Sequence, residues 1–485
     1  MALKYVGEFT IPLKNDRDER IATLIWGDPV HVLDESGALV KVWARARKGW
    51  VDRVALSDRS LLEIYVIDVG QGDGILLKTP EGNWHVIDAG IAGRDQMTKK
   101  GTANFLRWKF LKDLREEKVS LTNVILTHPD YDHYGGLLDV LSGELADGRK
   151  FGIEVENFYH SCLGRFKQSP KLGQRVNGEV GPFPNGYHGI RRRGSFITEL
   201  LDGRDSFVNL RRELDETFAE LAALVSRVPH NVRRLCHQDQ FLPGFRPGEA
   251  ELTIHVLGPI LERFGAGLDG LRWLGSQGRT RNGHSIVLRL DYRHARILLT
   301  GDLNTKSQKL LFSYHPETEF AADVAKGCHH GSADVDLDFF RAMKARATVI
   351  SSGDNENYAH PQPVVLGASA RYGREAIAPD GELVPPLVYS TELARSVKLA
   401  YPASLRVDLD KNPETPSRRV YPRYAEIKAQ GSKASYRPLR YTPLSTDLVY
   451  GLVNVRTDGV HILCATMEEK GNDFDVTIFK AGAEP

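Results

Sequence analysis

The chain has 485 residues, of which 41% are hydrophobic and 26% are charged, and this length and composition predict a soluble protein of two to four globular domains. Its 64 basic and 63 acidic residues nearly cancel, which excludes a global charge that would draw the protein to nucleic acid or a membrane. The four cysteines lie far apart and no apolar run has the length of a signal-peptide core or membrane span, so we expect no disulfide framework and a cytoplasmic location.

Residues 1–60 are predicted to form a separate small β-barrel. Short strand-like runs at residues 21–26, 31–33, 38–46 and 50–54 are separated by turn sequences, and this density of strands favours an antiparallel barrel. The run Lys48-Gly49-Trp50-Val51 resembles the ending of bacterial Src-homology-3-like barrels. Such a barrel either binds a protein or polymer partner or only caps the larger domain, and the sequence favours neither role.

A second unit begins near residue 63, where strands and helices alternate as they do in a sheet covered by helices. We predict strands at residues 64–69, 74–78, 84–88 and 124–127, and a helix at residues 103–117. The last of these strands leads directly into His128-Pro-Asp130-Tyr-Asp132-His133-Tyr-Gly135-Gly136. We expect Gly135 and Gly136 to let the chain turn tightly into a helix that begins near Leu137.

This segment places four side chains that can bind a metal within six residues, at the end of a predicted strand. A strand end followed by a tight turn holds several ligands on one rigid rim, as a metal site requires. Histidine nitrogen combined with carboxylate oxygen suits zinc, manganese or iron.

Residues 140–250 are rich in proline, glycine and basic residues and are predicted to be an insertion that contains a long helix at residues 195–227. Basic clusters recur there, among them Arg191-Arg192-Arg193. Each cluster alone is typical of a solvated loop. Together, beside a metal site in an otherwise neutral protein, they favour a polyanionic substrate.

Ligand-type residues also follow later strands, which are predicted at residues 252–257, 285–291, 296–300, 324–327 and 347–351. Asp302 follows the third of these strands, His329 and His330 the fourth, and His360 the fifth. Singly, Asp302 could cap a helix that begins at Leu303, and His360 could be a turn residue. Their repeated position after apolar runs instead indicates one site. Residues 370–445 predict a partly irregular arm that either extends a substrate groove or binds a partner.

These motifs resemble those of the metallo-β-lactamase superfamily, and within it the hydrolase domain of the competence protein ComEC and its stand-alone relatives. The matching segments are Asp68-Val-Gly-Gln-Gly-Asp73, Ile87-Asp88-Ala-Gly90, the run from Thr127 to Gly136, Asn282-Gly-His-Ser285, Leu299-Thr-Gly-Asp302, His329-His-Gly-Ser332 and Asn357-Tyr-Ala-His-Pro361. The resemblance covers residues 63–365 and implies an α/β fold, an αββα sandwich with a dinuclear metal site at one edge. We therefore expect a hydrolase domain at residues 63–369 with an insertion at 140–250, and a C-terminal extension at 370–485 whose last strands join the sandwich.

The resemblance also implies a role for individual residues. The expected ligands of two divalent ions, zinc or manganese, are His128, Asp130, Asp132, His133 and Asp302, with either His329 or His330. Asp130 stands where most of the superfamily has a second histidine, a change that the ComEC group shares. Around the ligands we expect Asp68, Asp73, Asp88, Asn282 and His284 to hold them by hydrogen bonds, with His284 as a further candidate ligand.

The chemistry expected of such a site is hydrolysis by an activated water. Asp132 would position this water, and His360 would protonate the leaving group or contact a phosphate. Substrate contacts are predicted for Arg191, Arg192, Arg193, Ser332 and Asn357. We predict a phosphodiesterase or nuclease with a nucleic acid or nucleotide substrate. A hydrolase of a small ester, thioester or lactone is the alternative, followed by a binding protein with a degenerate site.

Overall fold

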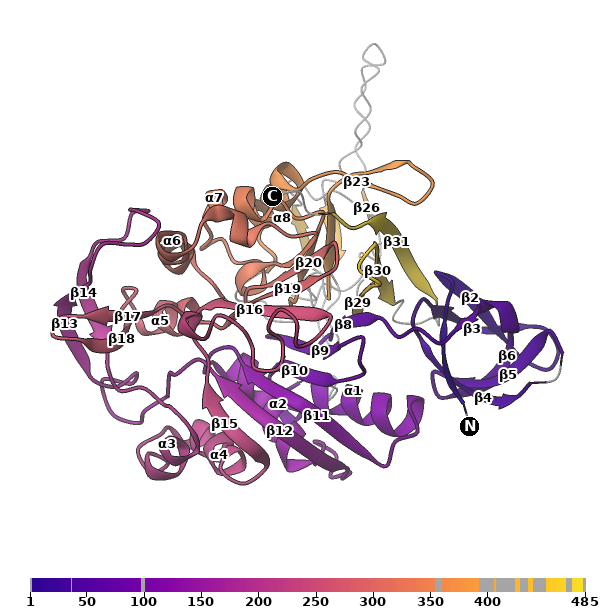
Figure 1. Ribbon diagram of the computed structural model, residues 1–485, viewed down its shortest axis with the longest axis horizontal. Helices are drawn as coiled ribbons and strands as arrows, with labels where there is room; N and C mark the ends of the chain where they lie inside the picture. The colour runs from indigo at the N-terminus through magenta and orange to yellow at the C-terminus, as the bar shows by residue number, and fades with distance from the viewer. Residues whose placement is uncertain are drawn as a thin grey trace, which may run out of the picture.

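The computed structural model describes residues 2–35, 37–96, 101–353, 360–391, 451–467 and 473–482, and the backbone of three short strands between residues 405 and 438. Two mixed β-sheets face each other, helices cover their outer faces, and a smaller all-strand sheet lies to one side (Figure 1). This is the αββα arrangement that the sequence predicts.

The first sheet has nine strands in the order β15-β12-β11-β10-β9-β8-β29-β30-β31. Its strands are β8 (Leu62–Val66), β9 (Gly74–Lys78), β10 (Trp84–Ala89), β11 (Lys118–Leu126), β12 (Gly152–His160), β15 (Pro229–Arg234), β29 (Val453–Thr457), β30 (His461–Met467) and β31 (Phe474–Lys480). The C-terminal strands therefore extend this sheet, with β29 antiparallel to β8.

The second sheet has six strands in the order β16-β19-β20-β21-β22-β25. They are β16 (Leu252–Gly258), β19 (Val287–Tyr292), β20 (Ala295–Leu299), β21 (Val324–Lys326), β22 (Ala347–Ile350) and β25 (Leu387–Ser390). The central strands of both sheets, such as β8, β9 and β22, are buried on two faces, which explains why they read as continuous apolar runs rather than as an alternating pattern. In β11, for example, Ile125 packs between the sheets while Val124 and Leu126 pack beneath the helices.

The helices form the two outer layers. Helices α1 (Thr102–Trp108), α2 (Tyr131–Ser142) and α4 (Glu216–Val225) contribute buried residues to the core on the outer face of the first sheet. Helices α6 (Thr305–Tyr314), α7 (Leu337–Met343) and α8 (Pro363–Tyr372) do the same on the second sheet. No helix of the described residues has the length and apolar character that crossing a bilayer requires.

The long helix predicted at residues 195–227 is wrong. Its first residues belong to β14 (Arg193–Ile197), which pairs with β13 (Arg175–Glu179) and β18 (Leu268–Arg272), and β17 (Leu261–Phe264) completes this small sheet. Helix α3 (Arg204–Asn209) follows, and α4 begins anew at Asp215, whose side chain accepts a hydrogen bond from Phe218 N (2.9 Å). Pairing with β18, about seventy residues away, buries Phe196 and Ile197, and no local pattern could reveal this partner.

The N-terminal unit is a seven-stranded antiparallel sheet in the order β3-β2-β6-β5-β4-β1-β7. Its strands are β1 (Leu3–Val6), β2 (Thr10–Lys14), β3 (Arg20–Ile25), β4 (Pro29–Asp34), β5 (Leu39–Ala44), β6 (Arg47–Asp52) and β7 (Leu56–Ser57). It has a hydrophobic core of its own, built around Leu13, Leu24 and Val42. The Src-homology-3-like identity and the domain boundaries stay predictions.

Candidate metal centre

The predicted site residues come together at one edge of the sandwich, where several strands end. Strands β10 and β11 run parallel, as do β20, β21 and β22. The carboxyl ends of parallel strands meet at one edge of a sheet, so the loops that follow them lie side by side. Asp88, His128, Asp302 and His330 are brought to this edge in that way.

Asp88 orients His133. Its carboxylate accepts hydrogen bonds from Thr127 N (2.8 Å), from Thr127 Oγ1 (2.5 Å) and from His133 Nδ1 (2.7 Å). The imidazole is thereby fixed with Nε2 facing the centre of the site. Burial lowers the pKa of His133, but the charges of Asp302 and Asp88 outweigh this effect and raise it well above its ordinary value.

The centre is formed by Asp302, His133 and His330. Asp302 Oδ2 lies 3.2 Å from His133 Nε2 and 3.0 Å from His330 Nε2, and the two histidine nitrogens are 3.3 Å apart. His128 Nε2 approaches Asp302 Oδ2 to 3.9 Å, and Asp132 Oδ2 lies 3.7 Å from His330 Nε2. Two overlapping sets of three ligand atoms, from His128, His133 and Asp302 and from Asp132, His133 and His330, each lie within 4.8 Å of one another.

These residues fit divalent cations. The buried His128 Nε2 and Asp302 Oδ1 have no hydrogen-bond partner, which is unusual for buried polar atoms. His128 Nδ1 instead contacts Thr127 Oγ1 (3.1 Å) and Ser285 Oγ (3.2 Å), so Nε2 is the atom left to face the centre. Burial lowers the pKa of His128 well below its ordinary value, and the neutral imidazole is the form that ligates a metal.

The loop that contains Gln71 supports Asp132. Gly72 has a φ of +96°, and a Cβ atom at this position would lie 1.6 Å from Asp132 O, so only glycine allows the two backbones to meet. Gln71 Nε2 then lies 3.4 Å from Asp132 Oδ2. The neighbouring Asp73 is buried against His330 Nδ1 (3.3 Å), while Asp68 accepts a hydrogen bond from Gly70 N (3.2 Å).

His329 and His330 have different environments, although they are adjacent and both have left-handed backbone angles. His330 contacts Ser351 O (3.0 Å) and Asp73 through Nδ1 and directs Nε2 into the centre. His329 contacts the side-chain amide of Asn282 (3.0 Å) through Nε2, which also lies 3.9 Å from Asp302 Oδ2, and it lines the adjoining pocket. Of the two, only His330 belongs to a converging ligand set among the described residues.

Asp130 is bound by arginines. Its Oδ1 atom is bonded by Arg281 Nε and by Arg165 Nη1 (3.2 Å), and its Oδ2 atom lies 3.9 Å from His128 Nε2. In the amide orientation that satisfies its neighbours, Asn282 donates to Asp130 Oδ2 (2.8 Å) and accepts from His329 Nε2 (3.0 Å). Among the described residues, Asp130 is absent from the converging ligand sets.

Three further charged residues lie at the site without a role assigned to them from the sequence, although Arg165 belongs to one of the basic clusters of residues 140–250. Arg165 comes from the insertion, and Arg281 from α5 (Gln277–Gly283). Lys326 is buried beneath the centre, where its Nζ pairs with Asp73, donates to Gly301 O (2.8 Å) and lies 3.5 Å from Asp302 Oδ1. A lysine inside the apolar run of residues 324–327 was the available signal, because lysine is almost never fully buried unless it is paired.

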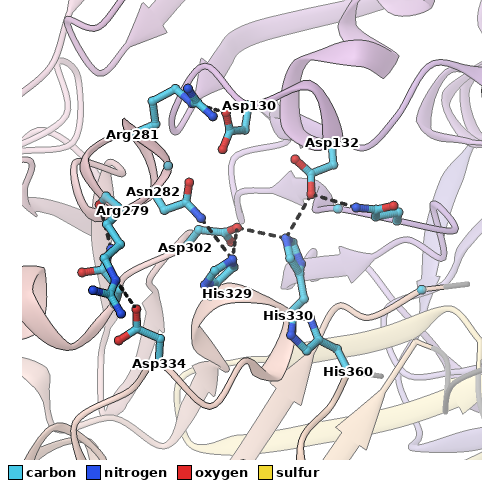
Figure 2. Close-up of a pocket in the computed structure, with 15 residues that line it drawn as sticks. Asp130, Asp132, Arg279, Arg281, Asn282, Asp302, His329, His330, Asp334 and His360 are labelled. Carbon is cyan, nitrogen blue, oxygen red and sulfur yellow. Dashed lines mark hydrogen bonds and ion pairs between the residues drawn. The ribbon is translucent and has the colours of Figure 1, made fainter. Parts of the chain in front are cut away.

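A pocket of about 400 Å³ opens onto the centre. Figure 2 shows Asp130, Asp132, Asn282, Asp302, His329, His330 and His360 around it, together with Arg279, Arg281 and Asp334. The His329 and His360 rings are 6.0 Å apart. Burial and the neighbouring histidines lower the pKa of His360 to about 4.

Several predicted residues lie elsewhere. Arg191, Arg192, Arg193 and Ser332 do not line this pocket, and Arg192 and Arg193 pair with Glu179 across β13 and β14 (3.5 and 3.8 Å). His284 is turned away, with Nε2 on Arg272 O (2.7 Å). Asn357 lies outside the described residues. Asp302 is not a helix cap, because Asn304 caps α6.

The turn predicted at Gly135 and Gly136 is also wrong. Helix α2 begins earlier, at Tyr131, so Asp132 and His133 lie in its first turn and both glycines lie within the helix. A Cβ atom on Gly136 would lie 2.1 Å from Ala89 O. The glycines therefore allow α2 to pack closely on the end of β10 rather than forming a turn.

Comparison with known proteins agrees with this geometry. The family model of the metallo-beta-lactamase superfamily matches residues 67–144. ComE operon protein 3 of Bacillus subtilis (strain 168) is 29% identical over 102 residues, which are 21% of this chain and 13% of that protein. The chain thus spans only a small part of this relative's length.

Two solved structures are similar at lower identity. One is the metallo-beta-lactamase fold protein YhfI from Bacillus subtilis, which is 12% identical. The alignment covers 59% of this chain and 85% of that chain, with a TM-score of 0.26. The other, Tm1679, is described as a metal-dependent hydrolase of the beta-lactamase superfamily, with 11% identity, 69% and 97% covered, and a TM-score of 0.31. Scores this low carry no argument, so the assignment rests on the sequence match and the motifs. Residues 67–144 thus match the metallo-β-lactamase superfamily, and the chain is similar over 102 residues to ComE operon protein 3.

Proposed function

We propose that this protein is a metal-dependent phosphodiesterase that acts on nucleic acid or nucleotides. The observation that carries the proposal is the wall of the pocket, which places Arg279 and Arg281 beside the candidate metal centre. Among the described residues that line the pocket, none has an aliphatic or aromatic hydrophobic side chain. A pocket for a small ester, thioester or lactone would bury apolar atoms, so this lining favours an anionic substrate.

Two divalent ions, zinc or manganese, are the proposed cofactors. His128, His133 and Asp302 would hold one ion, and Asp132 and His330 would hold the other. Ions bound there would activate a water near neutral pH and offset the charge on the phosphate oxygens. Lys326 and Asp88 would keep Asp302 and His133 in place by the contacts described above.

Asp132 and His360 have separate proposed roles. Asp132 is partly exposed in the pocket, and its carboxylate would accept a hydrogen bond from the attacking water and orient it. Burial, and to a smaller extent the neighbouring His330 and His329, lower the pKa of His360 to about 4. His360 is therefore neutral at pH 7. We therefore assign it a contact to a phosphate oxygen through its N–H group, rather than the proton donation that was the other possibility.

The proposal is tested by incubating the purified protein, with manganese or zinc, with bis-p-nitrophenyl phosphate, single- and double-stranded DNA, RNA, a lactone and a thioester. We expect turnover of phosphodiesters. Turnover of the lactone or thioester alone would reverse this assignment.

The Asp132→Asn variant should lose activity by at least about 100-fold, because it removes the group that orients the water. Its melting temperature should stay close to that of the wild type, since Asp132 faces the pocket. Asp338→Asn, at an exposed carboxylate on α7, is the control and should keep full activity. An active Asp132→Asn enzyme would contradict the role of Asp132.

A further inference from the structure

Two arginines of α5 extend into the pocket, and a carboxylate holds each of them through the same atom. Arg281 Nε bonds Asp130 Oδ1, and Arg279 Nε bonds Asp334 Oδ2 (3.1 Å). Figure 2 shows the two guanidinium groups at different places on the pocket wall, with Asn282 between them. Residues two apart on a helix do not face each other, so the two groups meet different parts of a ligand.

The helix that carries these arginines is fixed to the candidate metal centre. Asn282 contacts His329 at one end of α5, and the Ser276 side chain accepts a hydrogen bond from Arg279 N (3.3 Å) at the other. Asn304, which follows Asp302 in the chain, donates to Arg279 O (2.7 Å). The arginines are therefore held in position before any ligand binds, which reduces the entropic cost of binding.

Each guanidinium retains donors for a ligand. Within the described part of the chain, Asp130 is the side-chain partner of Arg281 and Asp334 that of Arg279, both through Nε. The terminal nitrogens thus present the forked donor pair that matches a phosphate. Arg281 lies deeper, with a side chain 18% exposed beside the metal ligands, whereas the side chain of Arg279 is 55% exposed.

We propose that α5 selects a phosphodiester that has a second phosphate next to it in the same molecule. Arg281 contacts the phosphodiester at the metal centre, and Arg279 contacts the neighbouring phosphate. The inference rests on the proposed phosphodiesterase function and deepens it, because a chain of nucleotides carries a second phosphate next to the one attacked and an isolated diester does not.

The test compares the dinucleotide TpT with its phosphorylated forms pTpT and TpTp, by kcat/KM with manganese. The wild type should prefer at least one phosphorylated form by about tenfold, the effect of one charge-assisted bidentate contact. Arg279→Met should abolish this preference, which is measured as the ratio of kcat/KM for the phosphorylated form to kcat/KM for TpT in the same variant. Arg279→Lys, which keeps the charge but not the fork, should keep part of the preference.

Arg149→Met is the matched control, because Arg149 also bonds a carboxylate through Nε (Asp147, 2.8 Å), is also 55% exposed and does not line the pocket. It should leave the preference intact. A preference equal in wild type and Arg279→Met, or lost equally in Arg149→Met, would overturn the inference while the phosphodiesterase function stands. Failure of the wild type to hydrolyse TpT, pTpT and bis-p-nitrophenyl phosphate would overturn the proposed function itself.

Binding provides a readout that does not depend on turnover. Fluorescence anisotropy measures the binding of a labelled single-stranded thymidine oligonucleotide to the Asp132→Asn protein. Adding Arg279→Met should lower the slope of log affinity against log salt by about 0.7, because loss of one phosphate contact on a single strand changes the slope by that amount. An unchanged slope would count against the contact with the neighbouring phosphate.

Discussion

At the scale of single residues, adjacent side chains with the same chemistry have different roles. His329 and His330 are indistinguishable in the sequence, yet His330 Nε2 lies 3.0 Å from Asp302 Oδ2 whereas His329 Nε2 lies 3.9 Å from the same atom. Burial lowers the pKa of His330, but Asp302 and Asp73 outweigh this and raise it to about 10 in the absence of a cation. The carboxylates of Asp302 and Asp73 lie close to the His330 ring. A divalent ion bound there would take the place of the proton on the imidazole.

This difference predicts unequal effects on metal binding. His330→Ala should weaken zinc affinity by more than about 100-fold, since loss of a supporting contact alone costs 10- to 100-fold. His329→Ala should change the affinity by about tenfold or less, because His329 contacts Asn282 instead. Competition with a zinc chelator measures both, and equal losses would mean that His329 is also a ligand.

At the scale of elements, the contact between α2 and β10 positions the main ligand segment. Asp132 and His133 occupy the first turn of α2, and Gly136 in its middle sets how closely it approaches Ala89. The sequence revealed the glycine pair but not its purpose, because a pair of glycines is equally typical of a turn. The close approach depends on where β10 lies, which only the assembled sheet determines.

Gly136→Ala should therefore destabilise the protein by about 1–3 kcal/mol, as overpacking of a close contact does. The added Cβ would meet Ala89 O at 2.1 Å, which must push α2 and its ligands away from the centre. Gly367→Ala is the matched control, because Gly367 lies in α8 with open space at its Cβ position. It should stabilise the protein by up to about 1 kcal/mol through helix propensity. Chemical denaturation measures both, and a stabilised Gly136→Ala protein would contradict the packing argument.

At the scale of the whole molecule, a buried ionic cluster joins the N-terminal sheet to the sandwich. Arg456 on β29 is almost fully buried, where it bonds Asp28 Oδ1 (2.8 Å) and donates to Trp26 O (2.7 Å) of the N-terminal unit. Arg45 also bonds Asp28 (2.7 Å), and Glu63 pairs with Lys78 (2.7 Å) nearby. Burial alone would raise the pKa of Asp28, but the charges of Arg45 and Arg456 hold it below its ordinary value. The N-terminal unit is thus fixed to the sandwich, and its binding of a partner stays a prediction.

Arg456→Leu should lower the free energy of unfolding by about 3–5 kcal/mol, because it breaks a buried ion pair and leaves Arg45 alone to offset the buried charge of Asp28. Arg59→Leu is the control, since Arg59 also links to the β29–β30 hairpin, at Asp458 (3.4 Å), but is largely exposed. Its loss should cost about 1 kcal/mol or less. Thermal unfolding distinguishes the two, and equal costs would show that burial of the cluster contributes nothing.

The sequence by itself determined the apolar runs of the two sheets, the order of the ligand motifs after those runs and hence the resemblance to the metallo-β-lactamase superfamily. These features are local, because a strand buried on both faces and a loop at its end are visible within ten residues. The orientation of His330 rather than His329, the burial of Lys326 and the position of α5 were decided by the tertiary structure. So was the small sheet that replaced the predicted helix in the insertion. Each depends on contacts between residues tens to hundreds of positions apart, and such contacts leave no periodic trace in a single sequence. The arginines that line the pocket are for this reason Arg279 and Arg281, with Arg165 bonded to Asp130 of the pocket wall, and not the cluster at 191–193 that stands out in the sequence.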